Sequence, residues 1–286
     1  MKKILVTGGN GQLATCIKAI EKEVTNLHIV YTDSSNLNIT NSESVDLFFS
    51  ENSYDFCINC AAYTAVDLAE KEEGKAILVN ETGVKNLALA CDKYNTVLIH
   101  VSTDFVFDGY KNTAYNENDQ TNPRGIYGVT KLKGEFAIRE ILTNYFIIRT
   151  SWLYSEYGNN FMKTMLRVSK DRNEISVVDD QIGTPTYAID LAMAIFKIIN
   201  IETNAYGIYN YSNEGVASWY DFACAIFDEC NVKIDVKPIK TVDYPTPAER
   251  PKFSVLNKSK LKSNLNISIP HWRDSLRIAM RNFNSN

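Results

Sequence analysis

The chain opens with the stretch Ile4-Leu5-Val6-Thr7-Gly8-Gly9-Asn10-Gly11-Gln12-Leu13-Ala14, an apolar run followed by a glycine-rich turn. After the turn, Leu13, Ile17 and Ile20 recur at helical spacing. A strand, a glycine turn and a helix in this order are typical of a dinucleotide-binding motif, in which the glycines let the backbone approach a pyrophosphate. The N-terminus of the helix stabilises the phosphate charge. The stretch therefore predicts the first strand and helix of a nucleotide-binding α/β fold.

An acidic residue after the next apolar run supports this interpretation. Residues 29–32 form that run, and Asp33 follows it, 22 residues after Gly11, where a carboxylate can bind the adenosine ribose hydroxyls. Residues 33–36 and the turn positions Asn10 and Gln12 offer no cation for the 2′-phosphate of NADPH. Because the charge of Asp33 would repel that phosphate, we expect NADH to be used at least as well as NADPH.

Strands and helices alternate over the first 150 residues. The apolar runs are nearly continuous, which indicates parallel strands covered on both faces. The predicted strands are residues 4–6, 29–32, 56–59, 97–101 and 146–148, and the predicted helices include residues 44–49, 69–94 and 131–141. This order predicts an α/β protein with a doubly wound parallel sheet, followed by a smaller C-terminal α/β region that covers the carboxyl edge of the sheet. We expect a nucleotide-binding domain of residues 1–150 plus about 186–204, and a substrate domain of about 151–185 plus 205–286.

Tyr127 and Lys131 lie four residues apart in a segment with a helical pattern, so both side chains project from one face. A phenol beside an ammonium group ionises more easily, which suits a group that gives a proton to an alkoxide near neutral pH. An ordinary exposed Tyr and Lys would produce the same pattern. The presence of the segment Ser102-Thr103-Asp104 upstream of Tyr127, together with the glycine turn, favours a catalytic pair.

Composition narrows the class of protein. The chain has 286 residues, of which 45% are hydrophobic and 22% charged, and a net charge of −4, which argues against nucleic acid or an anionic membrane as a partner. Because no apolar stretch approaches the length of a membrane span and the first strand begins at once, we expect a cytoplasmic protein. Residues 250–286 contain eight Lys and Arg and one acid. These basic residues form either a solvated face or a contact for a phosphate-bearing substrate.

The pair Cys57 and Cys60 has the CxxC spacing of a metal or redox site. Residues three apart on a strand point to opposite faces, however, and no second pair of cysteines or histidines completes a site. The interpretation is therefore buried structural thiols in a reducing compartment, and no metal site is predicted.

Together these motifs resemble the extended short-chain dehydrogenases/reductases, and further strings narrow the resemblance to the dTDP-4-dehydrorhamnose reductases. The resemblance extends over essentially the whole chain and includes its C-terminal region. It is carried by residues 59–67 (NCAAYTAVD), 102–109 (STDFVFDG), 127–135 (YGVTKLKGE), 149–154 (RTSWLY), 158–165 (GNNFMKTM), 180–186 (DQIGTPT), 219–221 (WYD) and 244–251 (YPTPAERP).

The resemblance implies a Rossmann-type fold and reduction of the C4 ketone of dTDP-4-dehydro-β-L-rhamnose to dTDP-L-rhamnose, a precursor of cell-wall polysaccharide. Hydride would come from NADPH or NADH, and Tyr127, Lys131 and Thr103 would be catalytic. The implied cofactor residues are Gly8, Asn10, Gly11, Gln12, Leu13, Asp33, Asn38, Ile39, Ala62, Tyr63 and Thr64, with Tyr127 and Lys131. The implied substrate residues are Thr103, Asp104 and Trp152; on physical grounds we add Asn160 and Arg250 for the diphosphate.

Three departures from the family pattern bear on specificity. Asn38 stands where an Asp is usual, Phe105 removes a hydroxyl near the sugar, and Glu249 replaces a basic residue beside Arg250.

Two alternative functions remain: a reductase that forms the C4 epimer, dTDP-6-deoxy-L-talose, and a non-catalytic dinucleotide-binding subunit like the β regulatory subunit of methionine adenosyltransferase. A dehydratase is disfavoured because Phe105 follows Asp104 where an acid is needed. The sequence is compatible with a homodimer.

Overall fold

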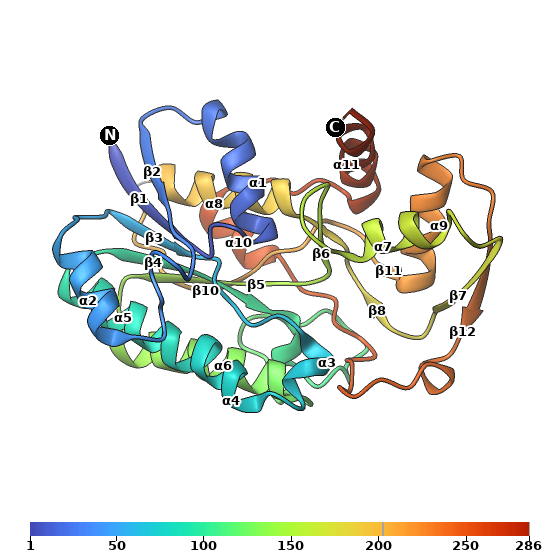
Figure 1. Ribbon diagram of the computed structural model, residues 1–286, viewed down its shortest axis with the longest axis horizontal. Coiled ribbons are helices and arrows are strands. Elements are labelled where there is room, and N and C mark those ends of the chain that lie inside the picture. The colour runs from blue at the N-terminus through green and yellow to red at the C-terminus, as the bar shows by residue number, and fades with distance from the viewer. Residues whose placement is uncertain (202, 286) are drawn as a thin grey trace.

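A six-stranded, wholly parallel sheet forms the centre of the protein in the computed structural model, which describes residues 1–201 and 203–285 (Figure 1). The strand order is β10-β5-β4-β3-β1-β2. The strands are β1 (Lys2–Thr7), β2 (Leu27–Tyr31), β3 (Phe56–Asn59), β4 (Val97–Thr103), β5 (Tyr145–Thr150) and β10 (Gly207–Asn210). The predicted doubly wound parallel sheet is confirmed.

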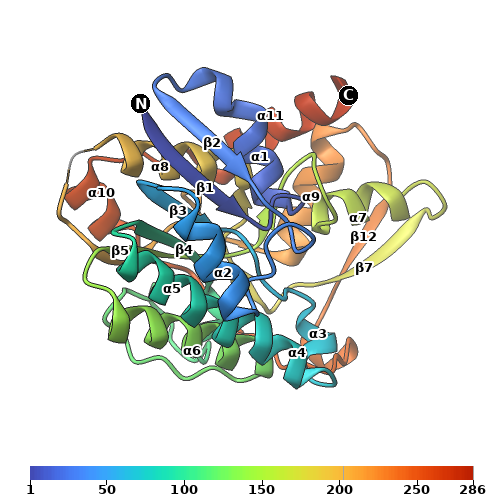
Figure 2. The ribbon, with the colours of Figure 1, turned by 60° about the vertical axis from the view of Figure 1, so that its left-hand side comes forward.

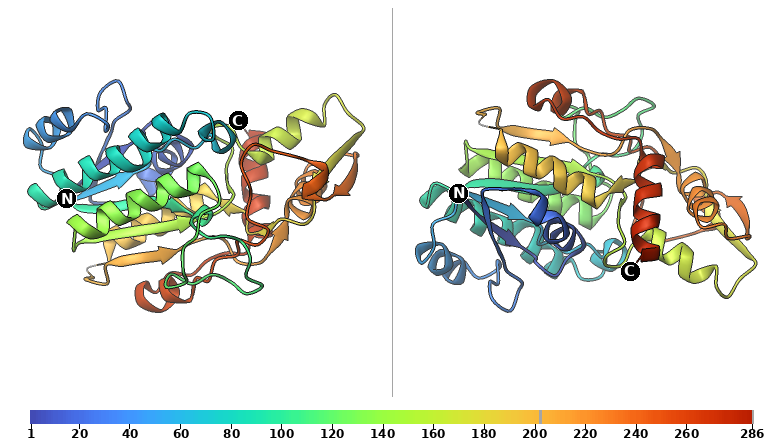
Figure 3. Two further views of the ribbon diagram at one scale, coloured as in Figure 1. Left: turned by 90° about the horizontal axis from the view of Figure 1, so that it is seen from below. Right: turned by 90° about the horizontal axis from the view of Figure 1, so that it is seen from above.

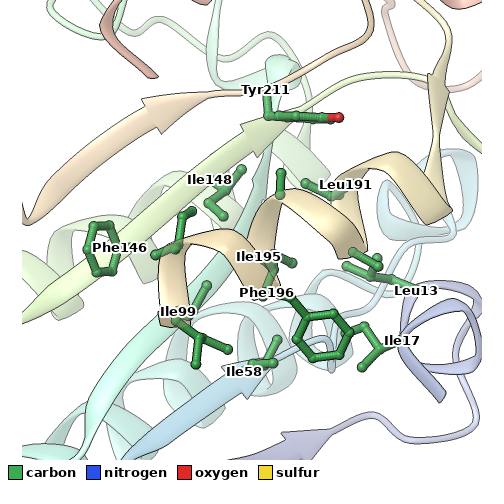
Figure 4. Close-up of a cluster of buried hydrophobic side chains, with 14 of the residues drawn as sticks. Leu13, Ile17, Ile58, Ile99, Phe146, Ile148, Leu191, Ile195, Phe196 and Tyr211 are labelled. Carbon is green, nitrogen blue, oxygen red and sulfur yellow. The ribbon is translucent and has the colours of Figure 1, made fainter. Parts of the chain in front are cut away.

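Helices cover both faces of this sheet, as the continuous apolar strands predict. One face packs against α1 (Gln12–Ile20), α8 (Ala188–Asn200) and α10 (Ser259–Leu265), and the other against α2 (Ser42–Ser50), α5 (Gly83–Lys93) and α6 (Ile126–Ile141). Figure 4 shows the first cluster, in which Phe196 of α8 lies between the sheet and Ile17 of α1. Cys57 belongs to the second cluster, whereas Cys60 packs against the first, so the two thiols point to opposite faces as predicted.

The C-terminal region forms its own core beyond one end of the main sheet (Figures 1 and 2). In both views of Figure 3, these C-terminal elements lie beyond one end of the six strands. The pairs of strands are β7 (Glu174–Val178) with β12 (Asp235–Ile239), β8 (Ile182–Gly183) with β11 (Ala217–Ser218), and β6 (Leu153–Tyr154) with β9 (Thr186–Tyr187). The helices are α7 (Phe161–Val168), α9 (Trp219–Glu229) and α11 (Trp272–Ser285), and η4 (Thr241–Asp243) follows β12.

The helix expected over residues 69–94 is confirmed over most of its length, but it begins later. After the short α3 (Val66–Ala69), a continuous helix runs through α4 (Glu73–Ile77), the π-helical turn η2 (Leu78–Thr82) and α5. The buried Asn80 of η2 hydrogen-bonds Tyr63 outside its own helix, and π-helical turns are frequent at functional sites. Strand β10 pairs with β5, so the main sheet also takes in a strand from the range 205–286.

The strand order changes direction between β1 and β3. From β1 the chain moves outward to β2 and then returns to the other side of β1. At such a switch point the loops that follow the two strands diverge and leave a crevice at the carboxyl edge, where ligands bind in open α/β sheets. Within the described residues, no helix has both the length and the apolarity of a membrane span.

Candidate active site

A cleft of about 400 Å³ opens at this switch point. It is lined by residues of the glycine turn, of the segment after β2 and of the loop after β3. Gly8 has φ +66°, and a Cβ there would lie 2.7 Å from the backbone nitrogen of Ala61, so only glycine lets the two loops approach this closely. Of the predicted cofactor residues, the cleft is lined by Gly8, Asn10, Gly11, Asp33, Asn38, Ile39 and Ala62.

The cleft carries a negative charge at Asp33. Its carboxylate accepts hydrogen bonds from Asn10 Nδ2 at 2.6 Å and from the backbone nitrogen of Ser35 at 2.9 Å. The hydrogen bonds from Ser35, and then the one from Asn10, hold the pKa of Asp33 below its usual range. Asn38 accepts hydrogen bonds from the backbone and hydroxyl of Thr40. Among the described residues that line the cleft, none is Lys or Arg.

Four other predicted cofactor residues do not line the cleft, and three of them have structural contacts of their own. Leu13 is buried in the core under α1, and Gln12 accepts a hydrogen bond from Asn160 at 2.8 Å. Tyr63 donates to Glu72, and its backbone is held on both sides by the side-chain amide of Asn80. Thr64 is exposed.

Helix α6 carries Tyr127 and Lys131, and a buried ion pair fixes its position. Arg149 of β5 donates to Glu135 of α6 from both Nε at 3.0 Å and Nη2 at 2.6 Å, and Ser102 of β4 donates to the same carboxylate at 2.5 Å. At the start of the helix, the backbone nitrogen of Ile126 donates to Glu70 Oε1 at 2.9 Å. Because that nitrogen has no partner within the helix, Glu70 acts as a cap supplied from another element.

Lys131 is buried, only 2% exposed, which excludes the interpretation as an ordinary surface lysine. Its Nζ donates to the carbonyl oxygen of Val101 at 2.7 Å and lies 3.3 Å from Nε2 of His100. Burial lowers the pKa of Lys131 to about 8, although the charge of Glu135 opposes this shift.

Tyr127 does not show the eased ionisation that its spacing from Lys131 predicts. Burial raises the pKa of Tyr127 to about 12, a hydrogen bond with the Thr103 side chain lowers it, and the charge of Asp104 raises it. The ring of Phe105 packs edge-on against the Tyr127 ring at 5.6 Å. The predicted eased ionisation is therefore wrong for the protein by itself, because loss of solvent around the phenol is the largest influence on its pKa. Tyr127 is a neutral phenol that carries a proton to give.

Thr103 and Asp104 stand at the carboxyl end of β4, where η3 (Asp104–Val106) begins. Thr103 Oγ1 accepts the backbone N–H of Phe105 at 3.2 Å and donates to Asp104 Oδ1 at 3.1 Å. Asp104 is 2% exposed, and its Oδ2 has no hydrogen-bond partner among the described residues. Burial raises the pKa of Asp104 to about 6, while hydrogen bonds moderate the shift. A buried carboxylate oxygen without a partner is uncommon in folded proteins and marks Asp104 as a candidate contact for a ligand.

Trp152 follows β5 with φ +47°, a backbone conformation that is strained for a bulky side chain. Its indole stacks on that of Trp219 at 3.6 Å, and a Cβ at Gly183 would lie 2.6 Å from its ring. Trp152 is thus held against two neighbours of the C-terminal region and stays partly exposed at the end of the sheet. Strain that is held in place by packing is common where a side chain must point at a ligand.

The two residues proposed for a diphosphate have protein partners. Asn160 caps α7 by accepting from the backbone of Lys163, and its amide nitrogen donates to Gln12 and Ser155. Arg250 makes a bidentate ion pair with Asp67 at 2.9 and 2.7 Å. Each contact joins the C-terminal region to the nucleotide-binding half, and their assignment to a diphosphate stays a prediction.

Sequence reasoning missed three residues that shape the site: His100, Asn59 and Glu70. His100 and Asn59 are buried and hydrogen-bond each other at 3.0 Å behind Lys131. The signal was a histidine inside the apolar run 97–101, because a buried polar side chain requires a partner. Glu70 gave no local signal, since it caps a helix 56 residues further along the chain.

The parallel sheet, the glycine turn at its switch point and the pair of half-buried Tyr127 and buried Lys131 on α6 define a nucleotide-binding oxidoreductase of the short-chain dehydrogenase/reductase type. Residues 1–285 match the family described as RmlD substrate binding domain. A dTDP-4-dehydrorhamnose reductase of Aggregatibacter actinomycetemcomitans is 42% identical over 288 residues, which cover 97% of this chain and 98% of that protein. The chain therefore belongs to the dTDP-4-dehydrorhamnose reductase family and is an oxidoreductase.

Solved structures support this assignment over the full length. A dTDP-4-dehydrorhamnose reductase from Clostridium acetobutylicum is 40% identical with a TM-score of 0.95, and the match covers 99% of both chains. A reductase of the same name from Bacillus anthracis, solved in complex with NADP, is 41% identical with a TM-score of 0.94 and covers 98% of this chain and 99% of that one.

Asp104→Asn is expected to stabilise the protein at neutral pH. Folding raises the pKa of this carboxyl from 3.8 to about 6, so the folded state binds its proton more tightly than the unfolded chain does between these values. Above that window the buried charge lowers stability, and its removal should raise the free energy of unfolding by about 1–3 kcal/mol. Urea unfolding should show the gain shrinking as pH falls through the window. Asp67→Asn, which breaks the pair with Arg250, should lower stability instead.

Gly183→Ala should disturb the packing of Trp152 against Gly183 and Trp219. The new methyl group would overlap the indole, which has to move or lose its stack on Trp219. We expect a loss of about 1–3 kcal/mol in the free energy of unfolding and a weaker near-ultraviolet circular dichroism signal from the stacked indoles. Gly74→Ala is the matched control, because a Cβ there meets nothing within 4 Å. If the two variants had the same free energy of unfolding and the same circular dichroism signal, the close packing of Trp152 against Gly183 would be contradicted.

Proposed function

We propose that the protein reduces the C4 ketone of dTDP-4-dehydro-β-L-rhamnose with NADH or NADPH and forms dTDP-L-rhamnose. The observation that carries the proposal is the neutral, half-buried phenol of Tyr127, with the buried Thr103 and Lys131 at the same carboxyl edge of the sheet. Full-length similarity to proteins named dTDP-4-dehydrorhamnose reductase supports the choice of substrate.

The cleft at the switch point fits a dinucleotide. Gly8 and Gly11 line the cleft with backbone, and Gly11 is also the N-cap of α1, so the N-terminus of this helix lies at the cleft. Asp33 would bind the adenosine ribose, with Asn38 and Ile39 at the adenine and Ala62, Tyr63 and Thr64 along the remainder of the cofactor. When bound, the reduced nicotinamide supplies the hydride for C4. Lys131 would hold the nicotinamide ribose, since its Nζ uses one hydrogen on Val101 and has others to donate.

Tyr127 is the proton donor in this proposal. As hydride forms a new C–H bond at C4, the ketone oxygen becomes an alkoxide, and the Tyr127 O–H bond breaks while a new O–H bond forms on that oxygen. A phenol with a pKa of about 12 still protonates an alkoxide, which is a much stronger base. Thr103 would donate a hydrogen bond to the same oxygen. The positive charge of Lys131 offsets the negative charge left on Tyr127 after the transfer.

Substrate contacts are proposed at the other side of the phenol. Trp152 offers an apolar face to the 6-deoxy sugar, and the free Oδ2 of Asp104 would accept from a sugar hydroxyl. The helix start at Asn160 and the guanidinium of Arg250 are proposed for the diphosphate, although Arg250 must then share its charge between the ligand and Asp67.

Tyr127→Phe tests the reaction and the donor together. With dTDP-4-dehydro-β-L-rhamnose prepared in situ, the wild-type protein should oxidise NADH or NADPH, and the variant should lose about a hundredfold or more in kcat with little change in cofactor affinity. Tyr110→Phe, at an exposed tyrosine, is the matched control.

NMR of the product separates the alternatives. Formation of dTDP-L-rhamnose supports the proposal. Formation of the talose epimer would support the same hydride and proton transfer but a different stereochemistry at C4. Binding of cofactor without oxidation would overturn the proposed reaction and favour a regulatory role.

The charge of Asp33 predicts the cofactor preference. We expect kcat/KM with NADH to equal or exceed that with NADPH, even though the Bacillus anthracis relative was solved with NADP. Asp33→Ala should shift the ratio several-fold toward NADPH by removing a like charge near the 2′-phosphate. Asp46→Ala is the control: this exposed carboxylate on α2 pairs with Lys93 of α5, and its removal should leave the ratio unchanged. A strong preference of the wild-type protein for NADPH would contradict the prediction.

A further inference from the structure

A chain of buried hydrogen bonds runs from the first strand to Lys131. Thr7 at the end of β1 donates to Asn59 Oδ1 at 2.7 Å, and Asn59 Nδ2 contacts His100 Nδ1 at 3.0 Å. His100 Nε2 lies 3.3 Å from Lys131 Nζ. All of these side chains are buried. The proposed reaction uses only the last member, so the role of the others is open.

The direction of the chain is set by one backbone group. The N–H of Ala61 donates to Asn59 Oδ1 at 3.1 Å, and a backbone N–H can only donate. The oxygen of the Asn59 amide is thereby fixed toward Ala61 and Thr7, and its nitrogen toward His100. Because an amide nitrogen has hydrogens and no acceptor capacity, Nδ1 of His100 must accept and carries no proton.

The proton of His100 is consequently on Nε2 and points at Lys131. Burial lowers the pKa of His100 well below its usual value, and the charge of Lys131 lowers it further, so the ring is neutral. A neutral amine at Lys131 can accept this N–H through its lone pair, but an ammonium group has no lone pair and faces the N–H with hydrogens of its own. The contact stabilises the amine and destabilises the ammonium.

We propose that His100 is a positioning residue that, held in one tautomer by Asn59, favours the uncharged amine of Lys131. The effect adds to the burial of Lys131 and is opposed by Glu135, whose charge is shared with Arg149. The other titratable groups near the lysine in the described structure are Tyr127 on its own helix and Cys60 after β3. The assignment gives Lys131 two protonation states of similar free energy at mildly alkaline pH.

The catalytic consequence rests on the proposed function. The ammonium form offsets the charge left on Tyr127, so the rate should fall as Lys131 loses its proton near pH 8. His100 would then set the alkaline limit of the reaction without touching substrate.

A direct titration tests the inference without any assay of activity. In protein labelled with ¹³C-lysine, the Lys131 resonance is identified by its absence in Lys131→Arg and followed with pH. In His100→Leu the midpoint should rise by on the order of one pH unit, the equivalent of one ordinary hydrogen bond. His28→Leu, at an exposed histidine, should leave it unchanged. An unchanged midpoint in folded His100→Leu would overturn the proposal, because burial alone would then account for the shift.

The tautomer of His100 provides a second test that needs no variant at position 100. Long-range ¹H–¹⁵N spectra of the wild-type protein, which has three histidines, should show Nδ1 unprotonated and Nε2 protonated. A proton on Nδ1 overturns the proposal even if His100→Leu does not fold. The pH profile of kcat should move with the NMR midpoint; if the midpoint moves while no turnover is found, the inference stands and the proposed function fails.

Discussion

The buried ion pair between Glu135 of α6 and Arg149 of β5 is the interaction on which the arrangement of the site depends. It joins a helix to the neighbouring strand in the interior, and Ser102 of β4 donates to the same carboxylate. Such a pair gains little net stability, because removing two charges from water costs about as much as their attraction returns. Its value is geometric: other registers of α6 against the sheet would leave a buried charge unpaired. This register brings Tyr127 and Lys131 to the carboxyl edge, beside Thr103.

Burial then determines what the functional groups can do. The same loss of solvent raises the pKa of Tyr127 and of Asp104 and lowers that of Lys131. Each shift favours the uncharged form, as desolvation always does. A protonated phenol, an acid with a pKa of about 6 and a lysine with a pKa of about 8 therefore result from one physical cause. The cost falls on stability, and the surrounding sheet, whose core residues are almost fully buried, offsets it.

Contacts between the two halves complete the site. Gln12 hydrogen-bonds Asn160, and Asp67 binds Arg250, so the start of α1 and helix α3 are each attached to the C-terminal region. Trp152 has a strained backbone conformation, and its ring packs against Gly183 and Trp219 of the same region. Asn160 and Arg250 are thus positioned by the opposite half of the molecule, whereas Trp152 is held by its own half.

Local patterns in the sequence determined the sheet, because apolar runs, a glycine turn and helical spacing reflect interactions within a few residues. For the same reason the sequence by itself predicts the pair Tyr127 and Lys131 and the acid Asp33. Local patterns do not reveal distant partners: Asn80 of the π-helical turn η2 hydrogen-bonds Tyr63, and β10 joins the main sheet by pairing with β5. Only tertiary structure decided that burial, more than the neighbouring lysine, governs the Tyr127 phenol, and that His100 faces Lys131. Solvent exposure and hydrogen-bond direction depend on groups brought together from several strands, which local sequence does not encode.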